Sequence, residues 1–315
     1  MVGKEASTKL FSLKPSTAGK VVWLDTRTVE FQPTSRLISG QIYEIDFYLS
    51  KLMTVAKGLE TFNYSLRVIP QNFGLQVDNI LPYVKTELTR QKIEGIVSTA
   101  DYAEADAIKK ILVAQQDGKM LSISWAHASD GKQHAFTVED VLRKEQASVV
   151  KLSMDGTALG IAQTSEEEVK VPALGDFTIT NVKVDQGSSQ SVVVQFSDPL
   201  REKQNLDGLI RIEGLGSLDY EIKDNEIKIY PPARQTGSKT LIIEAGIRNI
   251  LDYRMANRNS FDVQFEQVKP AVRFTGKGNI LPGTDGLIMP FEAVNLKAVD
   301  VTILKIYERN VLQFL

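Results

Sequence analysis

The sequence predicts a mainly β protein, built as tandem antiparallel β-sandwich domains with one helix in the middle unit. Three observations predict this fold class. Short segments alternate between apolar and polar residues, the same succession of segments occurs twice, and one stretch has helical spacing with helix-end residues. With 315 residues, of which 43% are hydrophobic, the chain is long enough for two or three domains.

Strand-like alternation is densest near the N-terminus and returns late in the chain. In these segments β-branched and aromatic residues recur at every second position, between clusters rich in Gly, Pro, Asp and Ser. Such residues fit a pleated surface with one buried face, so short strands at this spacing favour an antiparallel sandwich. The expected strands are 21–23, 29–31, 42–47 and 62–66 early in the chain, and 182–185, 191–196, 226–230 and 261–265 late in it.

The late segments repeat the early ones in order and at a nearly constant separation. The small drift is what loop insertions produce, because loops absorb length changes that paired strands do not. We therefore expect two copies of one sandwich module. The matched residues are Leu10, Phe11 and Leu13 with Leu209, Ile210 and Ile212; Val29, Phe31 and Pro33 with Ile227, Ile229 and Pro231; Gly40, Tyr43 and Ile45 with Gly237, Thr240 and Ile242; and Phe62, Tyr64 and Leu66 with Phe261, Val263 and Phe265.

A different unit lies between the copies. Asp101 is the expected N-cap of its helix, with Glu104 three residues later in a capping-box pattern. Ile108 and Leu112 then share one helix face, and Gly118 is expected to end the helix in the left-handed conformation. Residues 120–128, 132–141 and 148–154 are strand candidates, and the acidic stretch 164–168 is the expected linker.

These observations divide the chain into four parts. Residues 1–72 are predicted to form a β-sandwich module, 73–171 a β-rich domain with one α-helix at about 101–117, 172–269 the second β-sandwich module, and 270–315 the start of a third domain. Strand candidates 182–185 and 191–196 precede Leu209 in the second copy, whereas few residues precede Leu10 in the first. We therefore expect the first module to be truncated at its N-terminus and the third, with strand candidate 301–307, at its C-terminus. Open strand edges are expected at both ends.

The composition excludes most catalytic and polyanion-binding classes. Lys and Arg number 37 against 39 Asp and Glu, so no basic excess draws the chain to nucleic acid or anionic lipid. The chain has no cysteine, which excludes a disulfide, a thiolate nucleophile and Cys-ligated zinc, and it has only two histidines. Residues 1–5 contain no apolar signal-peptide segment. We expect no enzymatic activity and no cofactor.

The sharpest local pattern is a β-hairpin over 123–138. Asp130-Gly131 predicts a type I′ turn, which fixes the register of the two strands. Facing imidazoles could hold zinc or copper if a carboxylate joined them, so His127 and His134 are a weak candidate metal pair. The alternative is that they close the wet end of an apolar face, and that their mutual repulsion weakens the hairpin at acid pH. The expected cross-strand pairs are His127 with His134, Trp125 with Phe136, and Ile123 with Val138.

Two further motifs have simpler readings. The carboxylates of 166–168 could suggest calcium, but calcium loops need spaced ligands and a turn-forming Gly, so a solvated linker is expected. The glycines of 275–279 resemble a phosphate-binding loop, but no Gly-Lys-Ser/Thr opens a helix there, so a turn is expected. No Gly-x-Ser-x-Gly elbow occurs either. The sequence therefore offers no assembled catalytic site.

Several segments resemble a known family. Leu281-Pro282, the run Gly-Leu-Ile-Met-Pro-Phe-Glu-Ala-Val-Asn-Leu-Lys-Ala-Val-Asp-Val at 286–301, and 306–314 are similar to an early macroglobulin-domain segment of bacterial alpha-2-macroglobulins. Residues 196–200 and 265–270 resemble the preceding immunoglobulin-like module, and 11–15 with 23–33 the module before that. The resemblance spans nearly the whole chain. It implies tandem immunoglobulin-like or macroglobulin-like domains.

Members of this family are large envelope proteins, often lipoproteins, that act as protease traps. Many capture the attacking protease with a Cys-Gly-Glu-Gln thioester, which this chain lacks because it has no cysteine. The resemblance thus implies a non-enzymatic N-terminal arm that positions a broad-spectrum protease inhibitor at the periplasm or cell surface. Its partners would be the remaining domains of the parent chain and, through the full-length protein, host or environmental proteases. A missing N-terminal segment would anchor the arm to the envelope.

Two other functions are compatible with the fold. Immunoglobulin-like repeats also build the stalks and binding modules of cell-surface adhesins, and fold alone does not choose between them. An accessory domain of an enzyme is the third reading. The neighbouring residues of the gene would discriminate, through a Cys-Gly-Glu-Gln motif, further repeats with a sorting signal, or an attached catalytic domain.

Overall fold

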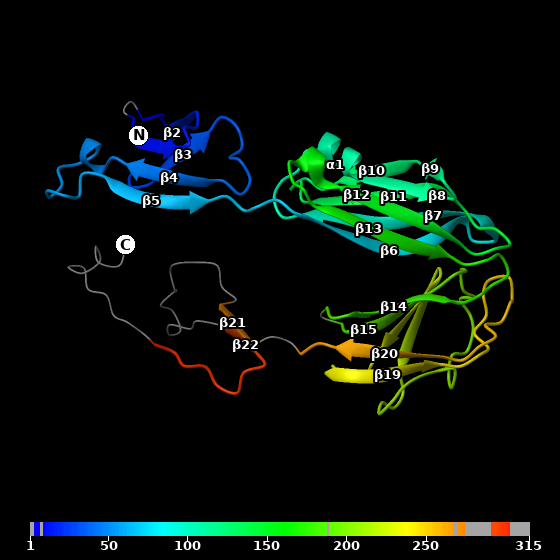
Figure 1. The fold of residues 1–315 in the computed structure, drawn as a ribbon. Coiled ribbons are helices and arrows are strands. Elements are labelled where there is room, and N and C mark those ends of the chain that lie inside the picture. Colours follow the sequence, from blue (N-terminus) through cyan, green and yellow to red (C-terminus); the bar gives the residue numbers. More distant parts are fainter. Residues whose placement is uncertain (1–2, 7–8, 188, 268–269, 275–290, 303–315) are drawn as a thin grey trace.

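The computed structural model describes residues 3–6, 9–187, 189–267, 270–274 and 291–302 (Figure 1). It confirms the predicted fold class: the structure is 51% strand and 5% helical, and its sheets are antiparallel. No helix in the described part of the chain is long and apolar enough to cross a bilayer.

The first unit is a small sandwich of a three-stranded and a two-stranded sheet. The larger sheet has the order β1-β4-β5 and the smaller one pairs β2 with β3. Its core consists of Leu13, Tyr43 and Ile45, with partly buried side chains such as Phe31 packed against them. The elements are β1 (Phe11–Lys14), β2 (Gly19–Trp23), β3 (Val29–Pro33), β4 (Ile42–Phe47), a 3₁₀ turn (Leu49–Lys51) and β5 (Phe62–Arg67).

The middle unit is a sandwich of two four-stranded sheets, with strand orders β10-β11-β7-β6 and β13-β12-β8-β9. Inward-facing residues from both sheets form one apolar core, and Ile108 and Ile111 of helix α1 are fully buried against it. The elements are β6 (Phe73–Val84), β7 (Glu87–Thr99), α1 (Ala105–Ile111), β8 (Leu112–Gln116), β9 (Lys119–Leu121), β10 (Ile123–His127), β11 (Gln133–Leu142), β12 (Ser148–Asp155), a 3₁₀ turn (Gly156–Leu159) and β13 (Thr164–Val171).

The helix predicted at about 101–117 was too long at both ends. The N-cap is Glu104, which makes no side-chain cap bond, whereas the carboxylate of Asp101 accepts from the amide of Tyr102. At the other end the chain enters β8 directly after Ile111, and from Leu112 on buried positions alternate with more exposed ones, as in a strand. Gly118 lies in the β8–β9 turn, not at a helix end.

The acidic stretch 164–168 is not a linker. It forms most of β13, which pairs along its whole length with β12. Exposed and half-buried positions alternate along it, with Glu166 and Glu168 exposed and Glu167 half-buried, and Glu166 pairs with Lys151 of the neighbouring strand at 2.9 Å. Charge on an edge strand blunts edge-to-edge association, so a charge run can belong to a sheet. The charge pattern was wrongly interpreted as a loop.

The second module contains a four-stranded sheet, β14-β15-β18-β17, and a three-stranded sheet, β16-β19-β20. Its core is larger than that of the first unit, and Val192, Val194, Ile227 and Ile229 are fully buried in it. The strands are β14 (Ile179–Asp185), β15 (Ser191–Phe196), β16 (Ile210–Ile212), β17 (Asp219–Lys223), β18 (Glu226–Tyr230), β19 (Gly237–Ile243) and β20 (Asn259–Phe265).

The two outer units share the same strand order, since β1 to β5 follow one another as β16 to β20 do. The ladders refine the residue matches. Leu13 pairs with Ile45 as Ile212 pairs with Leu241, so Ile45 corresponds to Leu241 and not to Ile242. In the ladders β4–β5 and β19–β20, Tyr64 lies opposite Ile45 as Phe261 lies opposite Leu241. Tyr64 therefore corresponds to Phe261, two residues before Val263, its match from the sequence. The two-residue shift at Tyr64 keeps the face of the sheet, because side chains alternate with a period of two, whereas the one-residue shift at Ile45 places the matched residue on the opposite face.

Near the C-terminus, β21 (Ala271–Phe274) pairs with β22 (Phe291–Val294). The expected turn at 275–279 lies outside the described residues. So do residues 303–307 of the strand candidate 301–307. The boundaries 72, 171 and 269 remain predictions.

Candidate functional site

The most unusual polar cluster of the described residues joins the middle unit to the second module. At its centre is Arg143, which directly follows β11 and is the largest fully buried side chain. A buried guanidinium is expensive unless each of its donors is satisfied. The surroundings of Arg143 therefore decide whether the two units hold together.

Backbone carbonyls of the connecting segment accept most of these donors. Nε of Arg143 donates to Pro172 at 3.1 Å and to Ala173 at 3.2 Å, and Nη2 donates to Ala173 and to Asp176, both at 2.9 Å. The connection between the two sandwiches is thus wrapped around one side chain. Because the carbonyls of Pro172, Ala173 and Asp176 are all bonded to the same side chain, this connection is held in one conformation and does not act as a flexible linker.

The second module supplies the countercharge. Nη1 of Arg143 donates to Oδ1 of Asp198 at 2.5 Å and to the carbonyl of Ser197 at 3.2 Å. The side chain of Asp198 is only 2% exposed. Its two oxygens also accept from the Ser197 hydroxyl and from Nδ2 of Asn249, at 2.9 and 2.6 Å. The ion pair is therefore fully hydrogen-bonded, as a buried pair must be to persist.

A second group of contacts between the two units is centred on Asn225. Asn79 sits at an irregularity of β6, and its amide exchanges hydrogen bonds with that of buried Asn225, at 2.9 and 3.0 Å. Asn225 also donates to the carbonyls of Ile80 and Phe196, one from each unit. Nε2 of Gln195 reaches the carbonyl of Asp78 at 2.5 Å. The irregularity turns polar groups of β6 outward, where the next module satisfies them.

An ionic contact completes the junction at its rim. The ammonium of Lys85 lies 2.9 Å from Asp224 and 3.3 Å from Glu202, and all three side chains are partly exposed. The pKa of Lys85 is raised, first by the hydrogen bond to Asp224 and then by that to Glu202. Because water screens exposed pairs, this contact adds orientation more than stability.

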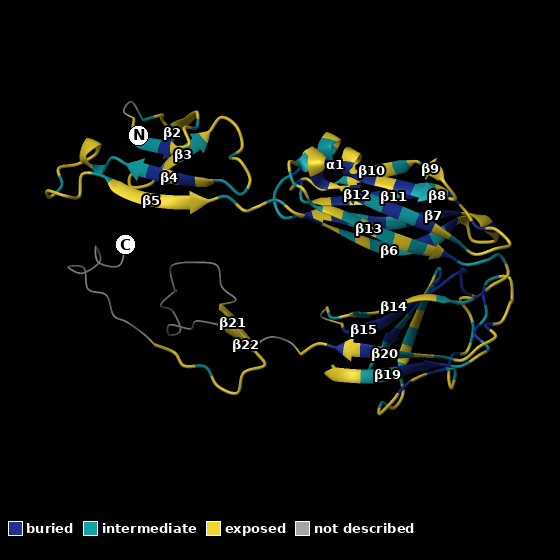
Figure 2. Ribbon diagram, viewed as in Figure 1, coloured by how far each residue is buried: buried dark blue, intermediate teal, exposed yellow. Residues whose placement is uncertain are grey.

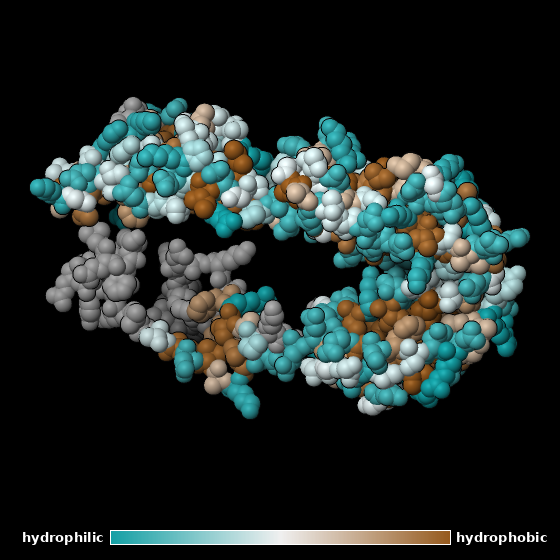
Figure 3. Space-filling view, in the orientation of Figure 1, coloured by the Kyte–Doolittle hydropathy of each residue, from teal (hydrophilic) through white to brown (hydrophobic). Residues whose placement is uncertain are grey.

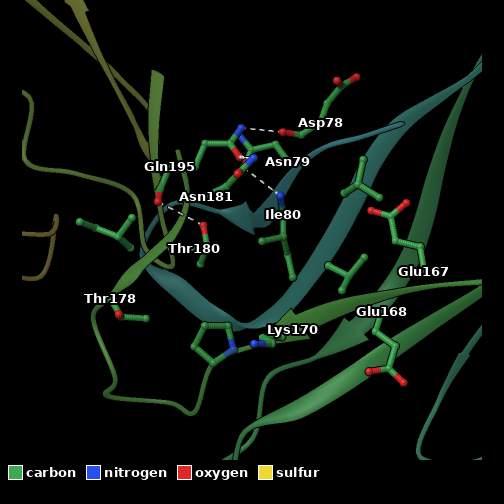
Figure 4. A pocket seen from close by; sticks show the side chains of 14 residues that line it. Asp78, Asn79, Ile80, Glu167, Glu168, Lys170, Thr178, Thr180, Asn181 and Gln195 are labelled. Carbon is green, nitrogen blue, oxygen red and sulfur yellow. Dashed lines mark hydrogen bonds between the residues drawn. The ribbon is translucent and has the colours of Figure 1, made fainter. Parts of the chain in front are cut away.

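The junction encloses a polar cleft of about 510 Å³ between β6, β13 and the start of β14. Figure 4 shows Asn79, Asn181 and Gln195 grouped on one wall, with Glu167 and Glu168 on another. Amides and carboxylates of this kind can form hydrogen bonds with a ligand. Since the lining contains no histidine and no hydroxyl hydrogen-bonded to a base, it offers no nucleophile for catalysis.

The predicted histidine hairpin is confirmed in its register. His127 pairs with His134, Trp125 with Phe136, and Ile123 with Val138. The turn differs from the expected type I′, because Gly131 donates to the carbonyl of Ala128 and only Gly131 has positive φ. The register survives because a four-residue turn centred on the same point joins the strands with the same pairing.

The Nδ1 atoms of the two imidazoles lie 2.9 Å apart, within hydrogen-bonding distance of each other. Two nitrogen ligands of one tetrahedral zinc lie roughly 3.3 Å apart, so this spacing is that of a hydrogen bond and not of a tetrahedral zinc site, and metal binding by the pair stays a prediction. His134 is fully buried, whereas His127 is half-buried, so only His127 lies at the solvent-exposed end of the face. Burial, followed by the nearby His127, lowers the pKa of His134. No group of three metal-ligating side chains occurs among the described residues.

The sequence did not single out Arg143, Asp198, Asn225 or Asn249. Arg143, Asp198 and Asn225 lie at or near strand ends, and Asn249 lies in the connection between β19 and β20. Nothing in their sequence neighbours distinguishes these polar residues from exposed ones. The only available sign was that Asp198 precedes proline within 196–200, a segment used for the family resemblance. Burial of these residues depends on how two units meet, which local patterns do not contain.

Comparison with known proteins finds sequence similarity over about half of this chain. No protein-family model matches the chain. Alpha-2-macroglobulins of two strains of Xylella fastidiosa, 9a5c and Temecula1 / ATCC 700964, are each 28% identical to it over 163 residues. The match covers 49% of this chain and 10% of each relative, so the matched part spans about a tenth of those proteins.

Solved structures with related architecture are distant. The ectodomain of mouse nectin-like molecule 4, Ig1–Ig3, has a TM-score of 0.26 and 13% identity, over 82% of this chain and 83% of that one. Domains 4–9 of surface layer protein SbsC have a TM-score of 0.31 and 13% identity, over 88% and 42%. Neither likeness is close enough to transfer a property. Over about half its length, this chain is similar to bacterial alpha-2-macroglobulin.

Proposed function

We propose that this chain is a non-enzymatic N-terminal arm of a bacterial alpha-2-macroglobulin-like protease inhibitor. In this proposal the arm positions the trap at the cell envelope, in the periplasm or at the cell surface. Similarity to two bacterial alpha-2-macroglobulins over half the chain supports the family. The proteases would be met by the full-length protein and not by this segment.

The observation that carries the positional role is the buried junction at Arg143. A spacer that defines distance and direction must resist bending where its domains meet, and interfaces between domains are movable by default. Here a fully buried guanidinium is shared by the middle unit, the connecting segment and the second module. Bending would break bonds that water does not replace inside the junction.

A catalytic role has little support in the chain. There is no cysteine, and both histidines are engaged with each other through Nδ1. The polar cleft at the junction contains no nucleophile beside a base. We therefore propose that its polar side chains serve the interface.

The experiment that tests this proposal separates the positioning role of the arm from the protease-trapping activity of the parent protein. The parent protein would be compared with a form lacking residues 1–267, both in solution and on spheroplasts. We expect both forms to block large substrates of several protease classes in solution, since trapping resides elsewhere. On spheroplasts, the shortened form should protect membrane proteins less well.

An Arg143→Ala parent should lie between the two forms on spheroplasts, with Arg201→Ala as the exposed arginine control. Equal protection by all forms would contradict the positional role. If the parent inhibits no protease but adheres to surfaces through this segment, it is an adhesin stalk instead.

A further inference from the structure

The two outer units differ in how far their sandwiches are closed. Strands β1 to β5 have counterparts in β16 to β20, but among the described residues the first unit has no counterpart of β14 and β15. In the second module these two strands complete the larger sheet and β14 also packs against β20. The comparison shows which surfaces of the first unit are left uncovered.

One uncovered surface is the apolar stripe of β5. Tyr64 and Leu66 lie opposite Ile45 and Tyr43 in the ladder, so all four side chains point to the core face. Ile45 and Tyr43 are buried, yet Tyr64 and Leu66 are 41% and 44% exposed, and Figure 2 shows β5 exposed from end to end. Val263, the counterpart of Leu66, is 3% exposed.

The other uncovered surface is the free edge of β3. Among the described residues β3 pairs only with β2, whereas β18 pairs with both β17 and β15. The counterparts Ile227 and Ile229 are fully buried, while Val29 and Phe31 are only half-buried. An edge of this kind presents unpaired N–H and C=O groups beside an open apolar core.

We propose that the first unit binds a β-hairpin of β14–β15 type by strand addition. The second strand of the hairpin runs antiparallel along β3, and its first strand covers the stripe of β5. Branched apolar residues at every second position face inward, as Val192 and Val194 do opposite Ile229 and Ile227. By this register their equivalents lie opposite Phe31 and Val29. This inference is independent of the proposed function.

The chain itself supplies the probe, a synthetic peptide of residues 177–197 labelled at its N-terminus. Added to the intact protein, it should bind saturably at one site and protect the amides of β3 from hydrogen exchange. A Val194→Asp peptide should bind at least tenfold more weakly, because it places a charge against the core. A Lys183→Glu peptide alters an exposed position and should bind like the parent peptide.

Variants of the protein test the receiving surface. Leu66→Glu puts a charge on the exposed stripe and should weaken peptide binding at least tenfold, whereas Ser65→Glu, on the opposite face of β5, should not. Both positions are exposed, so both variants should fold, which circular dichroism checks. Protection of β18 instead of β3 would mean exchange into the second module and overturn the proposal. Absence of binding, or protection of β3 by concentration-dependent self-association alone, would also overturn it.

Discussion

At the scale of single residues, the structure depends on one arginine. Arg143 contributes to neither apolar core, yet its guanidinium, which extends from the middle unit, donates to the connecting segment and to the second module. Arginine suits this place because its planar fork satisfies several acceptors while it keeps its charge. Lysine could not reach the same acceptors with one ammonium.

Replacing Arg143 should be costly. Arg143→Ala leaves Asp198 buried without its countercharge, and breaking a buried pair from one side typically costs about 3–5 kcal/mol. Urea denaturation should show this loss of unfolding free energy. Arg201→Ala removes an arginine that is 52% exposed and paired with Asp252, and should cost less than about 1 kcal/mol. Equal losses for the two variants would contradict the assigned role.

The histidine pair predicts a pH dependence. Burial lowers the pKa of His134 below its ordinary value of 6.5, so below that pH the unfolded chain binds a proton more readily than the folded one. The stability that depends on neutral His134 is therefore complete above about pH 6.5 and is lost as pH falls through the lowered pKa.

Melting temperatures at pH 7.5 and 5.5 measure this dependence. The decrease should be smaller for His134→Leu than for the unmodified protein. His127→Leu should reduce it only in part, because burial is the larger cause of the pKa shift. An unchanged decrease in the His134→Leu variant would assign the acid sensitivity to other groups.

At the scale of elements, the hairpin turns combine backbone geometry with packing. Gly131 has φ +62° and lies beneath the ring of Tyr102, so an added Cβ would be 2.3 Å from Cδ2 of that ring. Arg36 of the first unit stacks on the same ring at 3.5 Å. The Tyr102 ring therefore links the hairpin turn of the middle unit to Arg36 of the first unit.

Two glycine variants separate strain from collision. Gly118→Ala, at φ +78° with nothing within 4 Å, tests backbone strain alone and should cost about 1 kcal/mol. Gly131→Ala adds the clash with Tyr102 and should cost about 2–4 kcal/mol. Chemical denaturation of both variants would check the difference. A cost for Gly131→Ala no greater than for Gly118→Ala would show that the ring moves aside freely.

Sequence reasoning succeeded for elements whose pattern is local. The register of the histidine hairpin followed from alternation and the position of a turn, and it is confirmed. The predicted helix was too long because a spacing of four residues, from Ile108 to Leu112, puts both side chains on one face in a helix and also in a strand. In the structure Leu112 already belongs to β8. The junction was not predicted, because burial of Arg143 results from two units meeting.

At the scale of the whole molecule, the junction predicts a fixed angle between the middle unit and the second module. The chain has no native cysteine, so spin labels can be placed at Lys119→Cys and Asp262→Cys, two exposed positions, without background. We expect one narrow distance distribution between the labels. Arg143→Ala should broaden it and Arg201→Ala should not. A broad distribution in the unmodified protein would contradict a stiff arm.

The buried ion pair also changes what counts as a folding unit. Opening either sandwich would leave Arg143 or Asp198 buried and uncompensated, so the free energies of the two cores are coupled. Residues 73 to 267 should therefore melt as one cooperative transition, although they contain two hydrophobic cores. Recombination at the boundary near 171 would then separate an arginine from its carboxylate, and a transferable module must include both sandwiches.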